Sequence, residues 1–297
     1  MPELPEVETV RARLAPRLTG RRFARVDISD PRLTRPFEPH AVAAELEGET
    51  VASVERRGKY LVVRFESGRS LLIHLRMTGS FLHARGGTLE DDPHRRAVVR
   101  LDDGSDVAYR DVRRFGTWLI VESDELEPYL ATRLGGEPLE RGFTARRLAG
   151  RLQGRRAPIK AALLDQRTIA GMGNIYADEA LWRACVHPRR PAGDLTPEEI
   201  VQVTKGVKEA LRAGIARQGA TLRDYSTPDG ASGRMQHEFK VYGREGEPCD
   251  RCGTPIEKTR LVGRGTWYCP HCQPLGRLYA AARSSSRPSR SRRQSSV

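Results

Sequence analysis

The chain has 297 residues, of which 38% are hydrophobic, so it has room for two domains with separate cores but too little apolar content for a membrane protein. Lys and Arg total 51 against 38 Asp and Glu, and the resulting net charge of +13 attracts polyanions. Nucleic acid is therefore the leading partner class, and a compositional bias toward Arg is the alternative explanation of the charge.

The first segment predicts an extended start followed by an amphipathic helix from Pro5 to Leu18. Proline suits the first helical position, where a missing N–H costs nothing, and Glu6 and Glu8 suit a first turn that favours anions. Apolar residues then recur on one helical face, at Val7, Val10, Leu14 and Leu18. Because no basic segment followed by an apolar core precedes this helix, we expect no secretory signal and a cytoplasmic location.

The region from about residue 20 to residue 121 has the pattern of short β-strands. Residues 61–65 and 71–75 flank a polar turn and predict one hairpin, and residues 97–101 and 106–109 predict a second. A further strand is expected at 118–121. Short strands with frequent turns predict an antiparallel β-sandwich.

The rest of the chain is predominantly helical up to a cysteine module near its end. Helices are expected at 159–165, 175–184 and 197–214, the first two separated by a glycine-containing turn. The end of the chain, from residue 277, carries six Arg, many Ser and no acid, so we expect it to be disordered. The expected organisation is an α+β fold with an N-terminal sandwich domain (1–125), a helical domain (126–240), a zinc module (241–275) and a basic tail (276–297).

Four cysteines near the end of the chain have the spacing of a zinc site. The pairs Cys249-x-x-Cys252 and Cys269-x-x-Cys272 are separated by 16 residues, which suits two metal-binding knuckles joined by a hairpin. Four protein ligands leave no open position, so one structural Zn²⁺ is expected, and His271 is not needed as a ligand. The hairpin turn is expected at 263–266. The fifth cysteine, Cys185, is expected to be a reduced, buried thiol.

The amino terminus has the features of a nucleophile. Removal of Met1 exposes Pro2 as a secondary amine, and an α-amino group has a pKa of about 7.7–8.0, so a useful fraction is unprotonated at neutral pH. Such an amine attacks a sugar C1′ to give an iminium, which is an electron sink, and Glu3 stands next to it to move protons. The alternative interpretation is an ordinary helix start.

The run from Pro2 to Thr9 resembles the N-terminal signature of the formamidopyrimidine-DNA glycosylase family, and the resemblance extends to about Gln273. It is carried further by the segments 58–61, 74–79, 113–116 and 171–177 and by the four cysteines. The resemblance implies an N-terminal antiparallel β-sandwich flanked by helices and a C-terminal helical domain with a helix–two-turn–helix element and a zinc-finger hairpin.

The same resemblance implies the chemistry. The family removes oxidised purines (8-oxoguanine and formamidopyrimidines) from duplex DNA and then cleaves the abasic strand by β,δ-elimination. Pro2 is implied to form the Schiff base, and Glu3 to protonate the opening sugar. Lys59 is the implied proton donor for β-elimination, and Arg264, at the tip of the zinc hairpin, is implied to assist the δ step.

The resemblance also implies residues that bind damaged double-stranded DNA. Met77, Arg113 and Phe115 are expected to fill the space left by the flipped base, with Arg113 reading the orphaned base. Phosphate contacts are expected at His94, Arg155 or its neighbour Arg156, Lys160, Asn174 and Arg264. Asn174 stands at a helix start, where backbone N–H groups suit a phosphate. Glu6 is placed among the DNA-binding residues. A monomer associated with the bacterial nucleoid is expected.

Three features depart from the family pattern, and three alternatives stay open. Arg95 and Arg96 follow His94 where relatives often have a second histidine, the lesion-covering loop at 226–236 is variable, and the tail extends beyond the usual family end. A sister enzyme of the endonuclease VIII type for oxidised pyrimidines is disfavoured by Leu4. A non-catalytic DNA-binding paralogue is disfavoured by the presence of Pro2, Glu3 and Lys59 together, and a zinc-ribbon RNA-binding protein does not explain the N-terminus.

Overall fold

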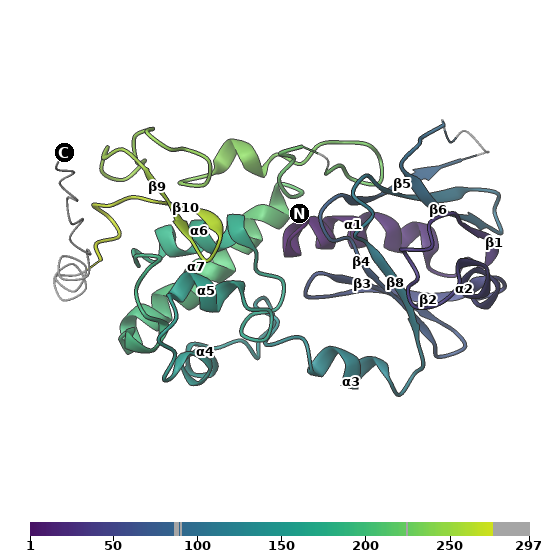
Figure 1. Ribbon diagram of the computed structural model, residues 1–297, viewed down its shortest axis with the longest axis horizontal. Helices are drawn as coiled ribbons and strands as arrows, with labels where there is room; N and C mark the ends of the chain where they lie inside the picture. Colours follow the sequence, from purple (N-terminus) through teal and green to yellow (C-terminus); the bar gives the residue numbers. More distant parts are fainter. Residues whose placement is uncertain (86–88, 90, 224, 276–297) are drawn as a thin grey trace, which may run out of the picture.

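The computed structural model describes residues 1–85, 89, 91–223 and 225–275 and has an elongated α+β architecture (Figure 1). An N-terminal β-sandwich forms one end of the molecule, and a helical part with a β-hairpin forms the other. The expected basic tail, 276–297, lies outside the described residues. Within the described part, no helix combines the length and the apolar character needed to cross a membrane.

The sandwich consists of two four-stranded antiparallel sheets, which confirms the predicted fold class. One sheet has, in spatial order, β1 (Phe23–Ile28), β6 (Arg95–Leu101), β7 (Asp106–Asp111) and β5 (Gly79–Ala84). The other has, in spatial order, β2 (Val51–Arg57), β3 (Tyr60–Phe65), β4 (Ser70–His74) and β8 (Thr117–Val121). Both predicted hairpins are present, as β3 paired with β4 and β6 paired with β7, and the strand expected at 118–121 pairs with β4.

Helix α1 (Leu4–Leu18) joins the two parts of the molecule. The apolar face predicted from the sequence packs into the sandwich core, through Val7, Val10, Leu14 and Leu18. Leu4, at the start of the same helix, belongs instead to the core of the helical part. A single helix therefore carries the first residues of the chain into the junction (Figure 1). A second helix, α2 (Pro39–Leu46), was not predicted and packs on β1.

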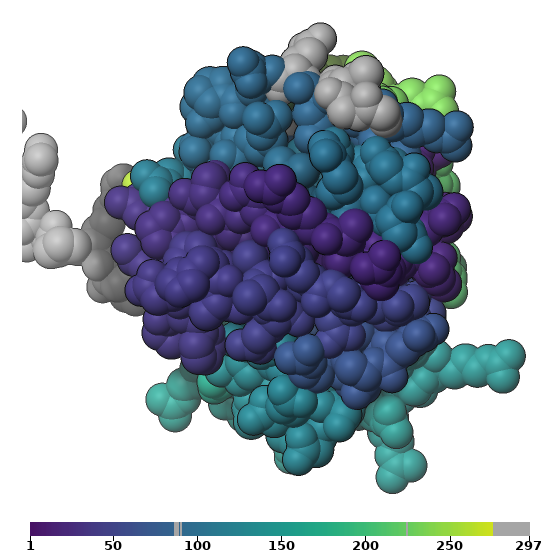
Figure 2. Space-filling view, turned by 90° about the vertical axis from the view of Figure 1, so that its right-hand side faces the viewer, coloured from purple at the N-terminus to yellow at the C-terminus, as the bar shows by residue number. Residues whose placement is uncertain are grey.

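The helical part contains the three helices predicted from the sequence, α5 (Ile159–Leu164), α6 (Asn174–Arg183) and α7 (Pro197–Ala216). A capping box begins α7, in which the Thr196 side chain accepts from Glu199 N and the Glu199 side chain accepts from Thr196 N. Seen from the sandwich end, the purple and blue N-terminal segments form most of the surface and the teal helical part projects beyond them (Figure 2). The remaining helices are α3 (Leu126–Ala131), α4 (Ala145–Leu152), η1 (Ala192–Asp194) and η2 (Met235–Glu238).

The cysteine module forms the predicted hairpin, with β9 (Glu257–Leu261) paired to β10 (Arg264–Tyr268). Its turn lies earlier than predicted, at Val262 and Gly263, which both have positive φ as a two-residue turn of this type requires. Arg264 is therefore the first residue of β10 rather than the tip. The hairpin module packs on α6 through a small core that includes Trp182.

The prediction that Cys185 is buried is wrong. Its backbone has φ +56° just after α6, and Val186 N donates to Leu181 O, which is a helix-ending arrangement with one left-handed residue. This conformation leaves the thiol exposed on the surface, where Arg251 Nη1 lies 2.9 Å from Sγ.

Candidate active site

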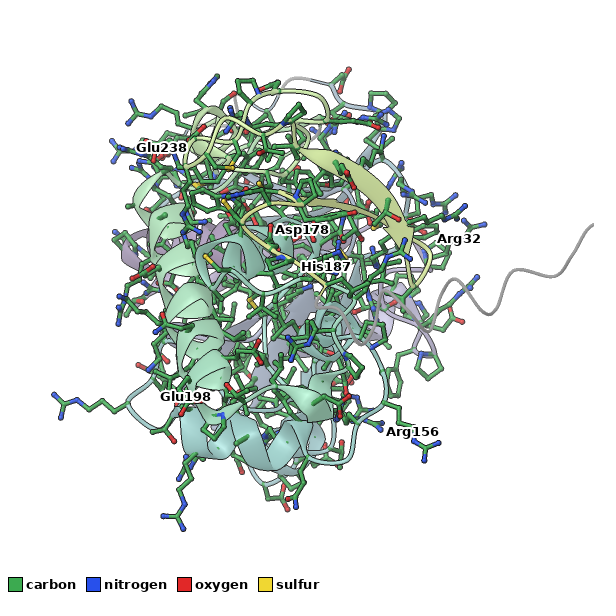
Figure 3. The ribbon with its side chains drawn as sticks, turned by 90° about the vertical axis from the view of Figure 1, so that its left-hand side faces the viewer. Arg32, Arg156, Asp178, His187, Glu198 and Glu238 are labelled. Carbon is green, nitrogen blue, oxygen red and sulfur yellow. The ribbon has the colours of Figure 1, made fainter. Side chains whose placement is uncertain are left out.

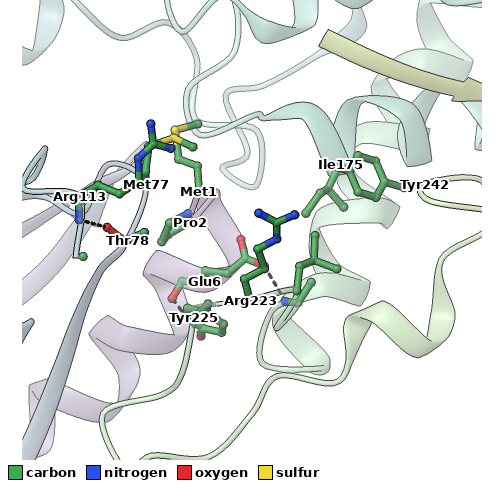
Figure 4. A pocket seen from close by; sticks show the side chains of 13 residues that line it. Met1, Pro2, Glu6, Met77, Thr78, Arg113, Ile175, Arg223, Tyr225 and Tyr242 are labelled. Carbon is green, nitrogen blue, oxygen red and sulfur yellow. Dashed lines mark hydrogen bonds between the residues drawn. The ribbon is translucent and has the colours of Figure 1, made fainter. Parts of the chain in front are cut away.

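A cavity of about 420 Å³ lies at the junction of the sandwich and the helical part (Figure 4). It brings together four of the predicted site residues, Pro2, Glu6, Met77 and Arg113. Met1 lines it beside Pro2 and is 42% exposed. The rest of the lining is Thr78, Gly79, Ile175, Ala220, Leu222, Arg223, Tyr225 and Tyr242.

Glu3 is held at the start of α6. Its Oε1 accepts from Ile175 N at 3.0 Å, and its Oε2 accepts from Tyr176 N at 3.3 Å. The helix N-terminus that the sequence suggested for a phosphate therefore binds this carboxylate, which is 3% exposed. A Cβ on Gly173 would lie 2.2 Å from Glu3 Cδ, so only glycine leaves room for Glu3 here.

The same turn fixes the entry of α1. Leu4 N donates to Gly171 O at 3.0 Å, and a Cβ on Gly171 would lie 2.7 Å from Leu4. Gly171 also has φ +83°, a conformation that favours glycine. The two glycines therefore allow the chain start to lie directly against the turn between α5 and α6.

Glu6 is buried in the pocket wall and organises the backbone around it. Its carboxylate accepts from Glu3 N, Ala220 N and the Tyr176 hydroxyl, each at 2.8 Å. Burial, with the Glu3 charge adding, raises the pKa of Glu6 to about 7. Glu6 thus links α1 to the start of the loop that follows α7.

Lys59 lies on the tight turn between β2 and β3. Glu137 accepts from Gly58 N and pairs with Arg56 at 2.9 Å, which ties this turn to the segment after α3. Gly58 has φ +58°. Lys59 is only 5% exposed, and burial lowers the pKa of its ammonium, while the Glu3 charge raises it and the Arg264 charge lowers it. The pKa of Lys59 thus responds to both Glu3 and Arg264.

The three expected gap-filling residues come from two adjacent loops. Arg113 N donates to Thr78 Oγ1 at 3.0 Å, which fixes the segment after β7 beside the turn that carries Met77. The Arg113 guanidinium lies 4.7 Å from the centre of the Phe115 ring, and that ring is 50% exposed. An exposed aromatic ring beside a cation, with the half-buried Met77 on the adjoining loop, is suited to wedging between bases.

The loop after α7 crosses from the helical part to the sandwich. Tyr225 donates through its hydroxyl to Gln218 O at 3.1 Å. Further along, His83 N on β5 donates to Pro228 O at 3.0 Å. Asp229 pairs with Arg17 and lies 3.5 Å from Arg13, both on α1. Ala220, Leu222, Arg223 and Tyr225 of this segment line the pocket, and Pro228 and Asp229 attach its far end to the sandwich and to α1.

The residues expected at phosphates differ in their surroundings. His94 is half-buried beside Arg96, at 3.4 Å, and Arg155 pairs with Asp165 at 3.0 Å. Arg156 extends outward from the surface (Figure 3). Asn174 uses its side-chain amide to donate to Gly265 O at 3.0 Å. Lys160 differs from all of these, because it is completely buried.

The four cysteines fit the predicted zinc ion. Their sulfur atoms lie within 4.8 Å of one another, with Cys252 3.5 Å from both Cys269 and Cys272, and Cys249 3.9 Å from Cys272. A tetrahedral Zn²⁺ with Zn–S distances of about 2.3 Å places sulfur atoms about 3.8 Å apart. Trp182 Nε1 donates to Cys249 Sγ at 3.4 Å, the kind of outer contact that orients a metal ligand.

Several residues that build the site were not found from the sequence. They act through contacts between segments that are distant in the sequence. Tyr176 bonds to Glu6, Glu137 to Gly58 and Thr78 to Asp111. Asp178 on α6 pairs with Lys160 on α5. No local pattern marks them.

Comparison with known proteins gives a consistent result. Residues 1–118 match the model for the formamidopyrimidine-DNA glycosylase N-terminal domain, residues 134–226 the model for the H2TH domain of the same enzyme, and residues 246–275 a zinc finger found in FPG and IleRS. The formamidopyrimidine-DNA glycosylase of Symbiobacterium thermophilum is 46% identical over 98% of this chain and 95% of its own length. That of Geobacillus kaustophilus is 46% identical over 92% of this chain and 100% of its own length.

Solved structures agree with these matches. A Lactococcus lactis FPG mutant in complex with Fapy-dG-containing DNA superposes with a TM-score of 0.86 at 36% identity, covering 92% of this chain and 100% of that chain. MutM in complex with DNA containing carbocyclic 8-oxo-G superposes with a TM-score of 0.85 at 36% identity, with the same shares covered.

Proposed function

The chain belongs to the formamidopyrimidine-DNA glycosylase family, and on that premise we propose a base-excision repair enzyme in which Pro2 is the nucleophile. It removes oxidised purines from duplex DNA and cleaves the resulting abasic strand. The observation that carries the assignment of the nucleophile is the position of Pro2 in the wall of the junction cavity, one residue from a buried carboxylate anchored on α6.

The proposed reaction begins with base displacement. After removal of Met1, the Pro2 nitrogen attacks C1′ of the damaged nucleotide, the C1′–N bond to the base breaks, and an iminium forms. The Pro2 nitrogen loses its proton to the Glu3 carboxylate as the bond to C1′ forms, and the displaced base leaves as an anion that takes a proton from solvent. Glu3 then passes its proton to the ring oxygen as the sugar opens, from a position fixed by the two N–H groups of α6. Binding the carboxylate at a helix N-terminus sets its direction relative to Pro2.

Strand cleavage follows from the iminium, which makes the C2′ proton acidic. Loss of that proton breaks the C3′–O bond, and a second elimination breaks the C5′–O bond, so that phosphates remain at both sides of the gap. Burial favours the neutral form of Lys59, which suits a group that exchanges protons near the sugar. Arg264, whose charge acts on Lys59, is assigned to the second elimination.

The DNA contacts complete the proposal. Met77, Arg113 and Phe115 fill the space left by the extruded base, and Arg113 offers donors to the base opposite. His94, Arg155 or Arg156, Asn174 and Arg264 are assigned to the phosphate backbone, and Lys160, which is fully buried, is assigned an indirect contribution to DNA binding. Glu6 contributes by holding the pocket wall. Zinc, when bound by the four cysteines, keeps the hairpin rigid and has no open coordination position for chemistry.

The organisation proposed for the whole chain is a sandwich domain (1–125), a helix–two-turn–helix domain (126–240), a zinc finger (241–275) and a basic tail (276–297). We infer that the enzyme acts as a monomer on DNA in the bacterial nucleoid. The basis for the location is the substrate, and the basis for the monomer is that one chain supplies every residue assigned to the reaction.

Trapping with borohydride tests the nucleophile. Reduction of the iminium on a lesion-containing duplex should give a stable protein–DNA crosslink, and mass spectrometry should find the adduct on the peptide that begins at Pro2. The crosslink should survive Lys59→Ala, with slower processing, and should be lost in a protein that retains Met1. An adduct on Lys59, or none with any damaged or abasic duplex, would overturn the assignment.

A further inference from the structure

The most deeply buried cation of the described chain lies beneath the zinc hairpin. Lys160, the second residue of α5, and Asp178, in the middle of α6, have side chains that are both 0% exposed. Lys160 Nζ lies 2.7 Å from Asp178 Oδ1. Burying a charge is costly unless it is paired and hydrogen-bonded, so a pair in this position needs further partners.

Those partners are supplied by β10. Lys160 Nζ donates to Gly265 O and to Thr266 Oγ1, each at 2.9 Å. The other oxygen of Asp178, Oδ2, accepts from Trp267 N at 3.1 Å. The pair therefore holds three consecutive residues of the strand, and Figure 3 shows Asp178 in the interior on the side of the molecule that carries the hairpin.

Asn174 adds a third attachment at the same place. Its side-chain amide donates to Gly265 O at 3.0 Å, the same carbonyl oxygen that accepts from Lys160. Both bonds fall on the residue directly after Arg264. By contrast, Val262 and Gly263 on the other side of Arg264 are exposed. The position of Arg264 along the strand is thus set from its C-terminal side.

A direct phosphate contact is a poor match for this lysine. Two of its three N–H donors are bonded to β10, and the third side of the ammonium faces Asp178. No part of the side chain reaches the surface. A phosphate on DNA would have to displace the hairpin to reach it.

We propose that Lys160, paired with Asp178, is a positioning residue for Arg264, holding the first residues of β10 so that the guanidinium reaches the 5′ side of the opened sugar. This rests on the proposed function, in which Arg264 assists the second elimination. The expected consequence of losing the clamp is selective: enzyme that has completed the first elimination should release its product before the second.

The test is the partition between the two eliminations. A 5′-labelled duplex with one abasic site gives an unsaturated aldehyde at the new 3′ end after the first step and a 3′-phosphate after the second, and the two products separate by mobility. Because the ratio is taken among strands that are already cleaved, a fall in the total amount of active enzyme does not change it.

Three variants make the partition diagnostic. Lys160→Met removes the ammonium, and the Lys160→Met/Asp178→Asn double variant also removes the buried carboxylate charge that would otherwise be left without a partner. Lys205→Met is the matched control, because Lys205 is an exposed helical lysine paired with Glu209. The melting temperature and zinc content of each variant report whether the hairpin is still folded.

We expect the aldehyde-to-phosphate ratio to rise about tenfold or more in both Lys160 variants, since displacement of a reacting group by 1 Å can cost about 10²-fold. The double variant should recover stability without restoring the ratio, and Lys205→Met should match the wild type. An unchanged aldehyde-to-phosphate ratio in the folded double variant overturns the proposal. If the ratio is unchanged and DNA affinity depends less on salt than in the wild type, Lys160 is a phosphate contact instead. Failure of the proposed function is a different result, in which the wild type itself gives no Pro2 crosslink.

Discussion

Replacement of Gly173 by alanine is the sharpest test of how Glu3 is held. The added Cβ would lie 2.2 Å from Glu3 Cδ and 2.4 Å from Oε1, whereas carbon atoms in contact are about 3.5–4.0 Å apart. The Glu3 carboxyl group must therefore move by more than about 1 Å. Because the group is buried and bonded to two N–H groups of α6, it cannot move without breaking those bonds.

The size of the effect follows from those contacts. Hydrogen bonds to a charged group contribute about 1.5–3 kcal/mol each, so losing both should lower the free energy of unfolding by about 3–6 kcal/mol. Misplacing a proton donor by 1 Å costs about 10²-fold, and losing a general acid costs about 10²–10⁴-fold. We therefore expect base excision to fall by about 10²–10³-fold.

The assay is single-turnover release of 8-oxoguanine from a duplex, with cleavage of an abasic duplex as the second substrate. Gly173→Ala should impair base release more than abasic cleavage, because the iminium on Pro2 forms without loss of a base in the second case. Gly150→Ala is the control: it lies in α4, nothing lies within 4 Å of its Cβ, and helix propensity predicts a gain of about 0.5–1 kcal/mol. Base release within threefold of wild type in Gly173→Ala would refute the reasoning.

Three further perturbations have defined outcomes. Burial raises the pKa of Glu6 from its ordinary value of 4.5 to about 7, so the folded protein holds this proton more tightly than the unfolded chain does. The free energy of unfolding should therefore fall as pH rises from about 4.5 to about 7. In denaturant unfolding measured across this pH range, Glu6→Gln should remove up to about 3 kcal/mol of that fall. Metal analysis should find one zinc per chain, and Cys249→Ser or a chelator should lower the melting temperature and DNA affinity, a result that zinc-free, fully stable protein would contradict. Asp229→Asn should weaken lesion excision about threefold to fivefold, as expected for the loss of a partly exposed ion pair with Arg17. Asp124→Asn, at an exposed position, should leave excision unchanged. Equal excision rates in the two variants would show that attachment of the loop after α7 to α1 does not contribute.

Much of the architecture was accessible from the sequence because it depends on local periodicity. The apolar face of α1, the hairpins β3–β4 and β6–β7, and the capped start of α7 each follow from spacings of a few residues. The zinc site was predictable for the same reason, since each Cys-x-x-Cys pair is a local geometric unit. Positions near the chain start were placed through the family resemblance, not through physical reasoning alone.

What the sequence did not show depends on contacts between distant segments. The burial of Lys160 requires Asp178 on another helix and a carbonyl group 105 residues away. Cys185 was expected to be buried because cysteine usually is, but the left-handed backbone that ends α6 turns it outward. Glu3 occupies a helix N-terminus that the local pattern assigned to phosphate.

The division of α1 between two cores has a consequence for synthesis on the ribosome. Leu4 packs with residues of α5 to α7, and the carboxylates beside Pro2 are bonded to Ile175, Tyr176 and Ala220. Pro2, the proposed nucleophile, emerges first from the ribosome, but its surroundings are complete only after more than two hundred further residues have been added. A nascent or prematurely terminated chain would therefore carry a reactive amine without the groups that direct it. Catalytic competence is in this way restricted to chains whose helical part has been made and docked.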